Sequence, residues 1–214
     1  MSSAPALLHP QFDDPKQQRD AARLGIWIFL ATEVLFFGDL LGAYAVTRVD
    51  HATAFALASS HTEITLGSIN TTVLLTSSLT MAIATICAQR GDQRGTTRWL
   101  AITGILGLLF LGIKADEYRI DFIEHLVPDA GFAIQGPEQS GARIFFYLYY
   151  LITGVHALHV LIGVFVIFWM VRASARGTFT THYTTPVDVT GLYWHLVDIV
   201  WLFVYPLIYL AGRK

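Results

Sequence analysis

Five long apolar stretches constrain the fold of this chain more than any other feature of its sequence. A bilayer core about 30 Å thick needs about 20 mostly apolar helical residues to cross it. The predicted spans cover residues 24–46, 66–88, 99–118, 144–171 and 189–210. The third stretch is apolar only to about Ile113, so we expect its helix to continue to Tyr118, with the Lys114 side chain extending towards the interface.

Composition favours a membrane protein over a soluble one. Hydrophobic residues make up 54% of the chain and charged residues 14%, whereas about 25% of a typical soluble domain is charged. Too little polar chain remains to cover five buried helices in water. We therefore predict an all-α integral membrane bundle, in which a polar N-terminal arm (1–22) precedes a single domain of five transmembrane helices (23–214).

Charge and cysteine content exclude several other classes. The net charge of −2 offers no basic face for nucleic acid. Cys87 is the single cysteine, which rules out a disulfide framework, a four-thiolate metal site or a two-cysteine copper centre within the chain. The first 22 residues contain no apolar core, so no cleavable signal peptide is expected.

Arginine and lysine in the loops predict the direction of insertion, because cytoplasmic loops are enriched in them. The clearest case is "AQRGDQRGTTRW", between the second and third spans. We predict a cytoplasmic N-terminus and an outside C-terminus, with the longest connection (114–143) outside. Gly104, Gly107 and Gly112 have a spacing typical of close helix packing.

Ionisable residues lie near the middle of three predicted spans. At a rise of about 1.5 Å per residue, one slab near the bilayer midplane holds all of them. They are Glu33, His156, His159, His195 and Asp198. A charge at that depth costs about 2.5–3.5 kcal/mol on insertion scales unless it finds a partner or a proton. The simplest arrangement is a buried polar network in which Glu33 pairs with a histidine of the fourth or fifth span.

Several roles remain open for these side chains. They could be hydrogen bonds between helices, or they could serve protons, lipid headgroups or a ligand, since ionisable groups inside a bilayer usually have a function. His156 and His159 have the spacing of a metal-ligand pair, and His156 with His195 could in principle hold a haem, but one layer of histidines is weak support. Asn70 and Thr32 are interpreted as packing residues.

Five ordered sequence blocks resemble one known family. "LGIWIFLATEVLFFGDLLGAY", "INTTVLLTSSLTMA", "ADEYRIDF", "LITGVHALHVLIGV" and "YWHLVDIVWLFVYPLIY" follow one another along the chain. Together they resemble subunit III of the haem–copper oxidases over about residues 24–209. The chain is similar to the short five-helix bacterial form, which lacks the first two of seven helices.

The resemblance implies a non-catalytic subunit in the bacterial plasma membrane. It implies packing against oxidase subunit I, with subunit II in the same complex, and no catalytic or metal site in this chain. Haem and copper would lie in the partner subunits, and phospholipid would bind. Glu33 matches the intramembrane glutamate of the family, and His159 matches the histidine that is its expected partner. Both are also the candidate lipid-binding residues.

Two other functions remain as alternatives. The tyrosines of "FFYLYYLITGVHALHV" are similar to those of relatives associated with nitric oxide reductases. A stand-alone proton-coupled transporter would use Glu33 and Asp198 as its relay. Transporters often show internal repeats and interrupted helices, and neither is visible here. The electron donor of the complex, cytochrome c or quinol, stays open.

Overall fold

The computed structural model describes residues 10–129, 131–179, 181 and 183–210, and within them it is built from helices. In chain order they are α1 (Pro15–Asp50), α2 (Ala52–Ser60), α3 (Ile64–Gln89), α4 (Gln93–Ile123), α5 (Gln139–Ala175), α6 (Thr185–Tyr205) and the π-helix η1 (Pro206–Leu210). Five helical segments are long and apolar enough to cross a membrane, namely α1, α3, α4, α5 and α6 with η1. The predicted all-α bundle with five spans is confirmed.

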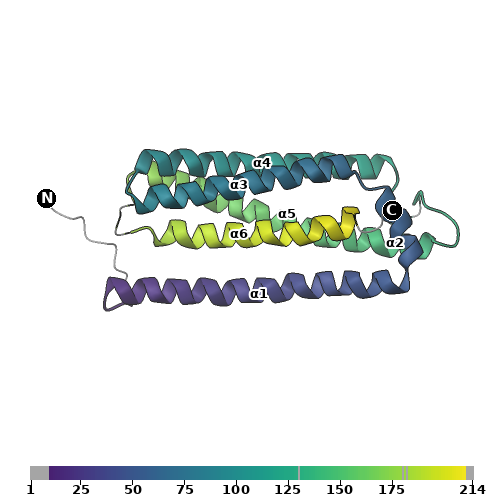
Figure 1. Ribbon diagram of the computed structural model, residues 1–214, viewed down its shortest axis with the longest axis horizontal. Coiled ribbons are helices and arrows are strands. Elements are labelled where there is room, and N and C mark those ends of the chain that lie inside the picture. Colours follow the sequence, from purple (N-terminus) through teal and green to yellow (C-terminus); the bar gives the residue numbers. More distant parts are fainter. Residues whose placement is uncertain (1–9, 130, 180, 182, 211–214) are drawn as a thin grey trace.

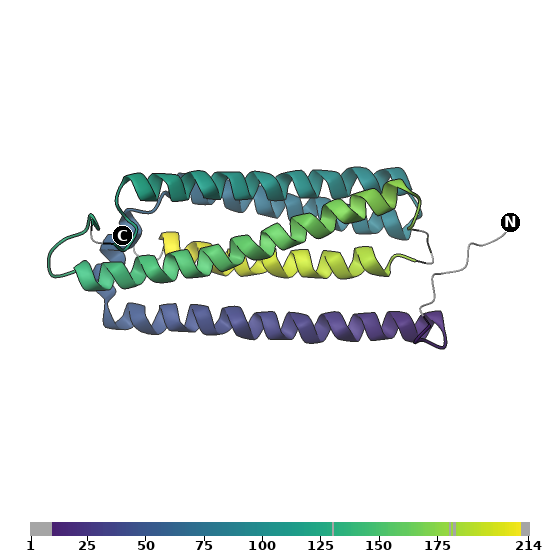
Figure 2. The same cartoon turned by 180° about the vertical axis from the view of Figure 1, so that it is seen from behind.

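The long helices run side by side, with α1 along one side of the bundle (Figure 1). The start of α1 and the turns that connect α3 to α4 and α5 to α6 lie at one end. The short helix α2 and the connection between α4 and α5 lie at the other end, as the reverse view also shows (Figure 2). Helix η1 ends at this second end, so the described chain starts and finishes on opposite sides. Which end faces the cytoplasm stays a prediction.

Helix boundaries differ from the hydropathy spans mainly at their polar ends. Helix α1 already begins at Pro15, because the side chain of the N-cap residue Asp14 accepts a hydrogen bond from the backbone N–H of Gln17. Residues 15–22 of the predicted arm are therefore helical, and residues 1–9 lie outside the described part. Helix α4 continues to Ile123. The connection predicted at 114–143 is thus only 124–138, and α2 was not predicted at all.

A tryptophan packed against two glycines connects its own helix, α6, to three other helices. Trp194 of α6 is fully buried, and its indole N–H donates to the Ser77 hydroxyl of α3 at 3.0 Å. A Cβ atom on Gly107 of α4 would come within 2.8 Å of the Trp194 ring, and one on Gly163 of α5 would also come within 2.8 Å. Glycine at these positions makes room for the indole. A Cβ atom on Gly112, by contrast, would meet nothing within 4 Å, so the helix packing predicted at Gly112 is wrong within this bundle.

Helix α1 is the least buried of the long helices. Only Leu30, Phe37 and Tyr44 are buried along its length. The Tyr44 hydroxyl donates to the Leu207 carbonyl of η1 at 2.8 Å, which holds one end of α1 against the bundle. Large apolar side chains such as Trp27, Leu35 and Val46 are exposed. They are suited to contact with lipid or with a neighbouring membrane subunit.

Replacing Gly107 with alanine tests this packing. We expect Gly107→Ala to destabilise the chain by about 1–3 kcal/mol, because the added methyl group meets Val164 and Trp194. Gly112→Ala is the matched control on the same helix and should be neutral or slightly stabilising. Unfolding of both variants in mixed detergent micelles measures the difference; equal stabilities would contradict the close contact at Gly107.

Candidate functional site

Glu33 and His159 form an ion-pair contact between α1 and α5. Glu33 lies at the middle of α1, and its Oε2 atom is 3.0 Å from Nε2 of His159. The two side chains are only 16% and 15% exposed. Depth predicts a histidine of the fourth or fifth span as the partner of Glu33, and the resemblance predicts His159. The structure contains this contact.

The ring orientation of His159 shows where a proton must lie. Its Nδ1 atom is 2.8 Å from the Val155 carbonyl oxygen, which can only accept, so Nδ1 carries a hydrogen. The 3.0 Å contact between Nε2 and Glu33 also needs a hydrogen. That hydrogen belongs either to an imidazolium facing a carboxylate or to a carboxylic acid facing a neutral imidazole. In both forms the pair holds one shared proton between two helices.

A phenylalanine and a tyrosine contact His159 of this pair. The Phe37 ring lies edge-on to the His159 ring at a centroid distance of 5.2 Å. Tyr193 of α6 donates its hydroxyl hydrogen to the backbone carbonyl of His159 at 2.9 Å. Helices α1, α5 and α6 therefore meet at this point, and apolar rings limit the water around the proton.

The other three predicted network residues do not join the Glu33–His159 pair. His156 is fully buried between the rings of Phe110 and Trp201, and neither ring nitrogen has a hydrogen-bond partner within the described residues. His195 instead contacts the Ser78 hydroxyl of α3 through Nδ1 at 2.8 Å. The Asp198 carboxyl is 4% exposed and lies near the same Ser78 hydroxyl. His195 and Asp198 therefore share one position beside α3, apart from the Glu33–His159 pair and from His156.

A second group of buried charges lies in α4, where a lysine at the lipid interface was expected. The Lys114 side chain does not extend to the interface; it is 2% exposed. Its ammonium donates to Glu117 at 3.1 Å, to the Tyr149 hydroxyl at 3.0 Å and to the Tyr209 hydroxyl at 2.8 Å. The expectation for Lys114 is wrong because tyrosines from α5 and η1 meet it inside the bundle. We call Lys114, Glu117, Asp121, Tyr149 and Tyr209 the α4 cluster.

The sequence carried a weak signal for the α4 cluster. Lys114, Glu117 and Asp121 are spaced three and four residues apart in "KADEYRID", which places them on one helix face. That spacing distinguishes them from Asp116 and Arg119, which form an exposed pair at 2.7 Å on another face. The two tyrosine partners are distant in sequence, so only the fold brings them to the lysine.

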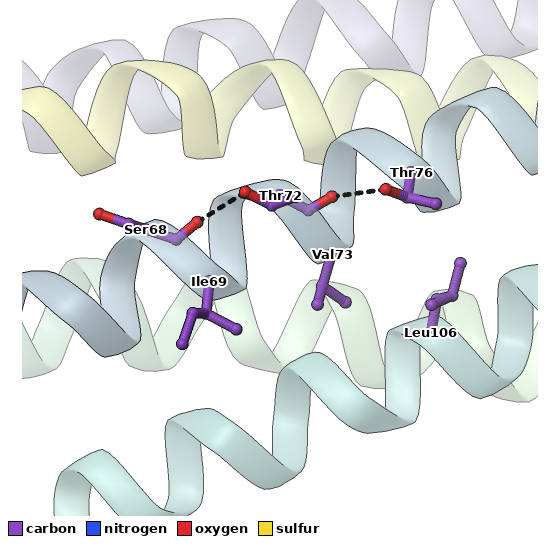
Figure 3. A pocket seen from close by; sticks show the side chains of 6 residues that line it. All are labelled: Ser68, Ile69, Thr72, Val73, Thr76 and Leu106. Atoms are coloured by element: carbon purple, nitrogen blue, oxygen red, sulfur yellow. Dashed lines mark hydrogen bonds between the residues drawn. The ribbon is translucent and has the colours of Figure 1, made fainter.

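Two apolar surface grooves are further candidate binding surfaces. One lies on α3 beside Leu106 of α4 and has a volume of about 320 Å³ (Figure 3). The Thr72 and Thr76 hydroxyls there donate to carbonyls of their own helix, one turn back. A larger groove of about 570 Å³ lies between α1 and α6, where apolar side chains and His195 line it. Both surfaces are more suitable for acyl chains than for a polar ligand.

Metal ligation finds little support in the part of the chain that is described. No three histidine, cysteine, aspartate or glutamate side chains there lie close enough together to hold a metal ion. The two histidines of the H-x-x-H pair have different environments, because His159 contacts Glu33 and His156 packs between aromatic rings.

The fold and these sites define a polytopic membrane protein that pairs ionisable side chains between its helices. The sequence matches the family model for cytochrome c oxidase subunit III over residues 13–213. The chain therefore belongs to the cytochrome c oxidase subunit III family and is a subunit III of the haem–copper terminal oxidases, which include cytochrome c and quinol oxidases. This relationship favours an oxidase subunit over a stand-alone transporter or a nitric-oxide-reductase accessory subunit.

Several relatives match nearly the whole chain. Cytochrome c oxidase subunit 3 of Thermostichus vulcanus is 30% identical, and the match covers 94% of this chain and 92% of the relative. Quinol oxidase subunit 3 of Bacillus spizizenii is 31% identical, with 88% and 86% covered. Cytochrome bo(3) ubiquinol oxidase subunit 3 of Pseudomonas aeruginosa is also 31% identical, with 88% and 84% covered.

Neutralising Lys114 should reveal the difference between a buried and an exposed ion pair. We expect Lys114→Met to cost about 3–5 kcal/mol, because it leaves buried carboxyl groups without their cation. Arg119→Met removes the exposed partner of Asp116 on the same helix and should cost about 0–1 kcal/mol. Detergent-induced unfolding compares the two variants; similar losses would refute the buried position of Lys114.

Proposed function

We propose that this chain is a non-catalytic subunit that supports proton uptake by its oxidase partner, acting through the Glu33–His159 pair. Haem and copper belong to the partner subunits in this proposal. The chain packs directly against oxidase subunit I in a complex that includes subunit II. The family membership supports an oxidase complex, and the bacterial origin of the named relatives supports a location in the bacterial plasma membrane.

The single observation that carries the proposal is the 3.0 Å contact between Glu33 and His159. A carboxyl and an imidazole at this distance share a proton that either group can carry. The two side chains keep 16% and 15% of their surface exposed. A proton held there can exchange with a neighbouring subunit or a water chain, which a fully enclosed group cannot do.

Phospholipid is a second proposed partner of the same region. The groove between α1 and α6 is lined by Trp27, Val34 and Leu196, among other apolar side chains. Its volume of about 570 Å³ and its apolar lining fit an acyl chain. Glu33 and His159, the candidate lipid-binding residues, do not line this groove, so we propose that they act on the proton and that the groove holds the lipid tail.

Replacing Glu33 with glutamine removes the acidic proton but keeps a hydrogen bond to His159. The glutamine amide can donate to Nε2 of His159, so Glu33→Gln should preserve assembly and the optical spectra of the oxidase while removing the titratable acid. We expect a reduced rate of proton-linked turnover, or fewer turnovers before inactivation, in the purified complex reconstituted into vesicles.

Asp39→Asn is the matched control. Asp39 is an exposed acid on the same helix, six residues after Glu33. Its replacement should leave both the rate and the number of turnovers unchanged. Equal behaviour of the Glu33→Gln and Asp39→Asn enzymes over many cycles would argue against a proton role for the pair.

A further inference from the structure

The α4 cluster is a closed polar site that the proposed function does not use. Lys114, Glu117, Asp121, Tyr149 and Tyr209 come from α4, α5 and η1, and each is at most 2% exposed. The three hydrogens of the Lys114 ammonium are all used, one each on Glu117, Tyr149 and Tyr209. Rings of Tyr149 and Tyr118 also approach the ammonium, at 4.5 and 4.8 Å. The cation is thus fully satisfied without Asp121.

Counting hydrogens reveals that the oxygen contacts of the cluster require one more proton. The Tyr149 hydroxyl lies 2.9 Å from Glu117 Oε1 and 2.9 Å from Asp121 Oδ2. The Tyr209 hydroxyl lies 2.5 Å from the same Glu117 oxygen. These three oxygen–oxygen contacts each need a hydrogen, but two tyrosines supply only two. With both acids ionised, one pair of oxygen lone pairs would face each other without a hydrogen.

The charges of the cluster also require one additional proton. One ammonium and two carboxylates would leave a net charge of −1 inside the bundle, where water is excluded and an unpaired charge is costly. Glu117 is the ionised partner of Lys114, because the ammonium and the Tyr209 hydroxyl both donate to it. Asp121 has no salt bridge to the lysine and contacts the Tyr149 hydroxyl. One proton on Asp121 makes the cluster neutral and supplies the missing hydrogen.

We propose that the α4 cluster holds one proton on the Asp121 carboxyl, facing the Tyr149 hydroxyl, and that Asp121 keeps this proton when the helices assemble and close the cluster. Tyr149 then donates its own hydrogen to Glu117, and the contact with Tyr209 ties η1 to the same acid. No other bond forms or breaks. This site is separate from Glu33 and His159 and does not rest on the role proposed for them.

The surroundings of Asp121 define what else could titrate with it. The ionisable groups that face Asp121, or that lie next to its partners, come from α4, α5 and η1. They are Lys114, Glu117, Tyr118 and Glu124 of α4 and its C-cap, Tyr149 and Tyr150 of α5, and Tyr209 of η1. Lys114 is the one cation of this group, and Glu117 already neutralises it.

Infrared spectroscopy of the purified oxidase complex tests the proposal directly. A protonated carboxyl group has a C=O stretching band that a carboxylate lacks, and the band shifts when the complex is produced in D₂O. We expect Asp121→Asn to lose one such band. We also expect Glu117→Gln to lose it, because Asp121 then gives up its proton to balance Lys114. Asp116→Asn, which changes an exposed acid of the same helix, should keep the band. A band that persists in Asp121→Asn overturns the proposal.

Assembly provides a second measurement with the same variants. The asparagine amide introduced by Asp121→Asn would match a protonated carboxyl in shape and would donate the third hydrogen to Tyr149. This variant should therefore remain in the complex to the same extent as the unsubstituted chain, as should Asp116→Asn. If Asp121 were instead an ionised counter-charge, its neutral isostere would be lost from the purified complex. That loss would overturn the proposal even if no spectrum could be recorded.

Discussion

The requirement that each buried ionisable group find a partner determines how these helices meet. Between helices in lipid there is no general hydrophobic driving force, because acyl chains are as apolar as leucine. Apolar contacts alone would therefore leave the position of α1 poorly defined. The Glu33–His159 contact and the Tyr44 bond to η1 connect this lightly buried helix to the bundle at two levels. The geometry of the candidate site and the position of α1 thus depend on the same interaction.

The same requirement explains the interior of the bundle around α4. Lys114, Glu117 and Asp121 would be costly singly, but they share one helix face and meet two tyrosines from other elements. Tyr209 lies in the π-helix η1, which follows α6 at Pro206, and its side chain is fully buried at the cluster. A polar cluster of this kind specifies where three segments meet. It holds η1 against α4 and α5 through the contacts of Tyr209 with Lys114 and Glu117.

Sequence reasoning found the Glu33–His159 contact because depth alone restricts the choice of partners. Glu33, His159 and three other residues fall in one slab, and the family motif selects His159 among the histidines. Depth does not give the direction of a side chain, so His156, His195 and Asp198 were assigned to the network of Glu33, although His156 faces aromatic rings and the other two lie at Ser78. Lys114 was misassigned for a related reason. Its tyrosine partners lie 35 and 95 residues away, and no local pattern indicates them.

Helix ends were harder to predict than helix existence. Hydropathy identifies the part of a helix that contacts lipid, but α1 and α4 extend beyond their apolar stretches as polar helices stabilised by Asp14 and Asp92 at their N-caps. The short helix α2 is too brief for a membrane window, although Phe55 within it is buried against Tyr44. Such elements follow from tertiary contacts, and these become visible only once the long helices have been packed together.

The Glu33–His159 pair and the α4 cluster differ in how far they are exposed to the surroundings of the bundle. Glu33 and His159 are partly open beside α1, the least buried of the long helices, so a proton there can be passed to a neighbouring subunit. The α4 cluster is closed on all sides, and its oxygens are already bonded to one another. A group that exchanges protons during turnover must reach water or another subunit, whereas a group that only neutralises charge must avoid both. The difference in burial is the reason why we propose proton exchange for the first position and charge balance for the second, although both use a carboxyl group.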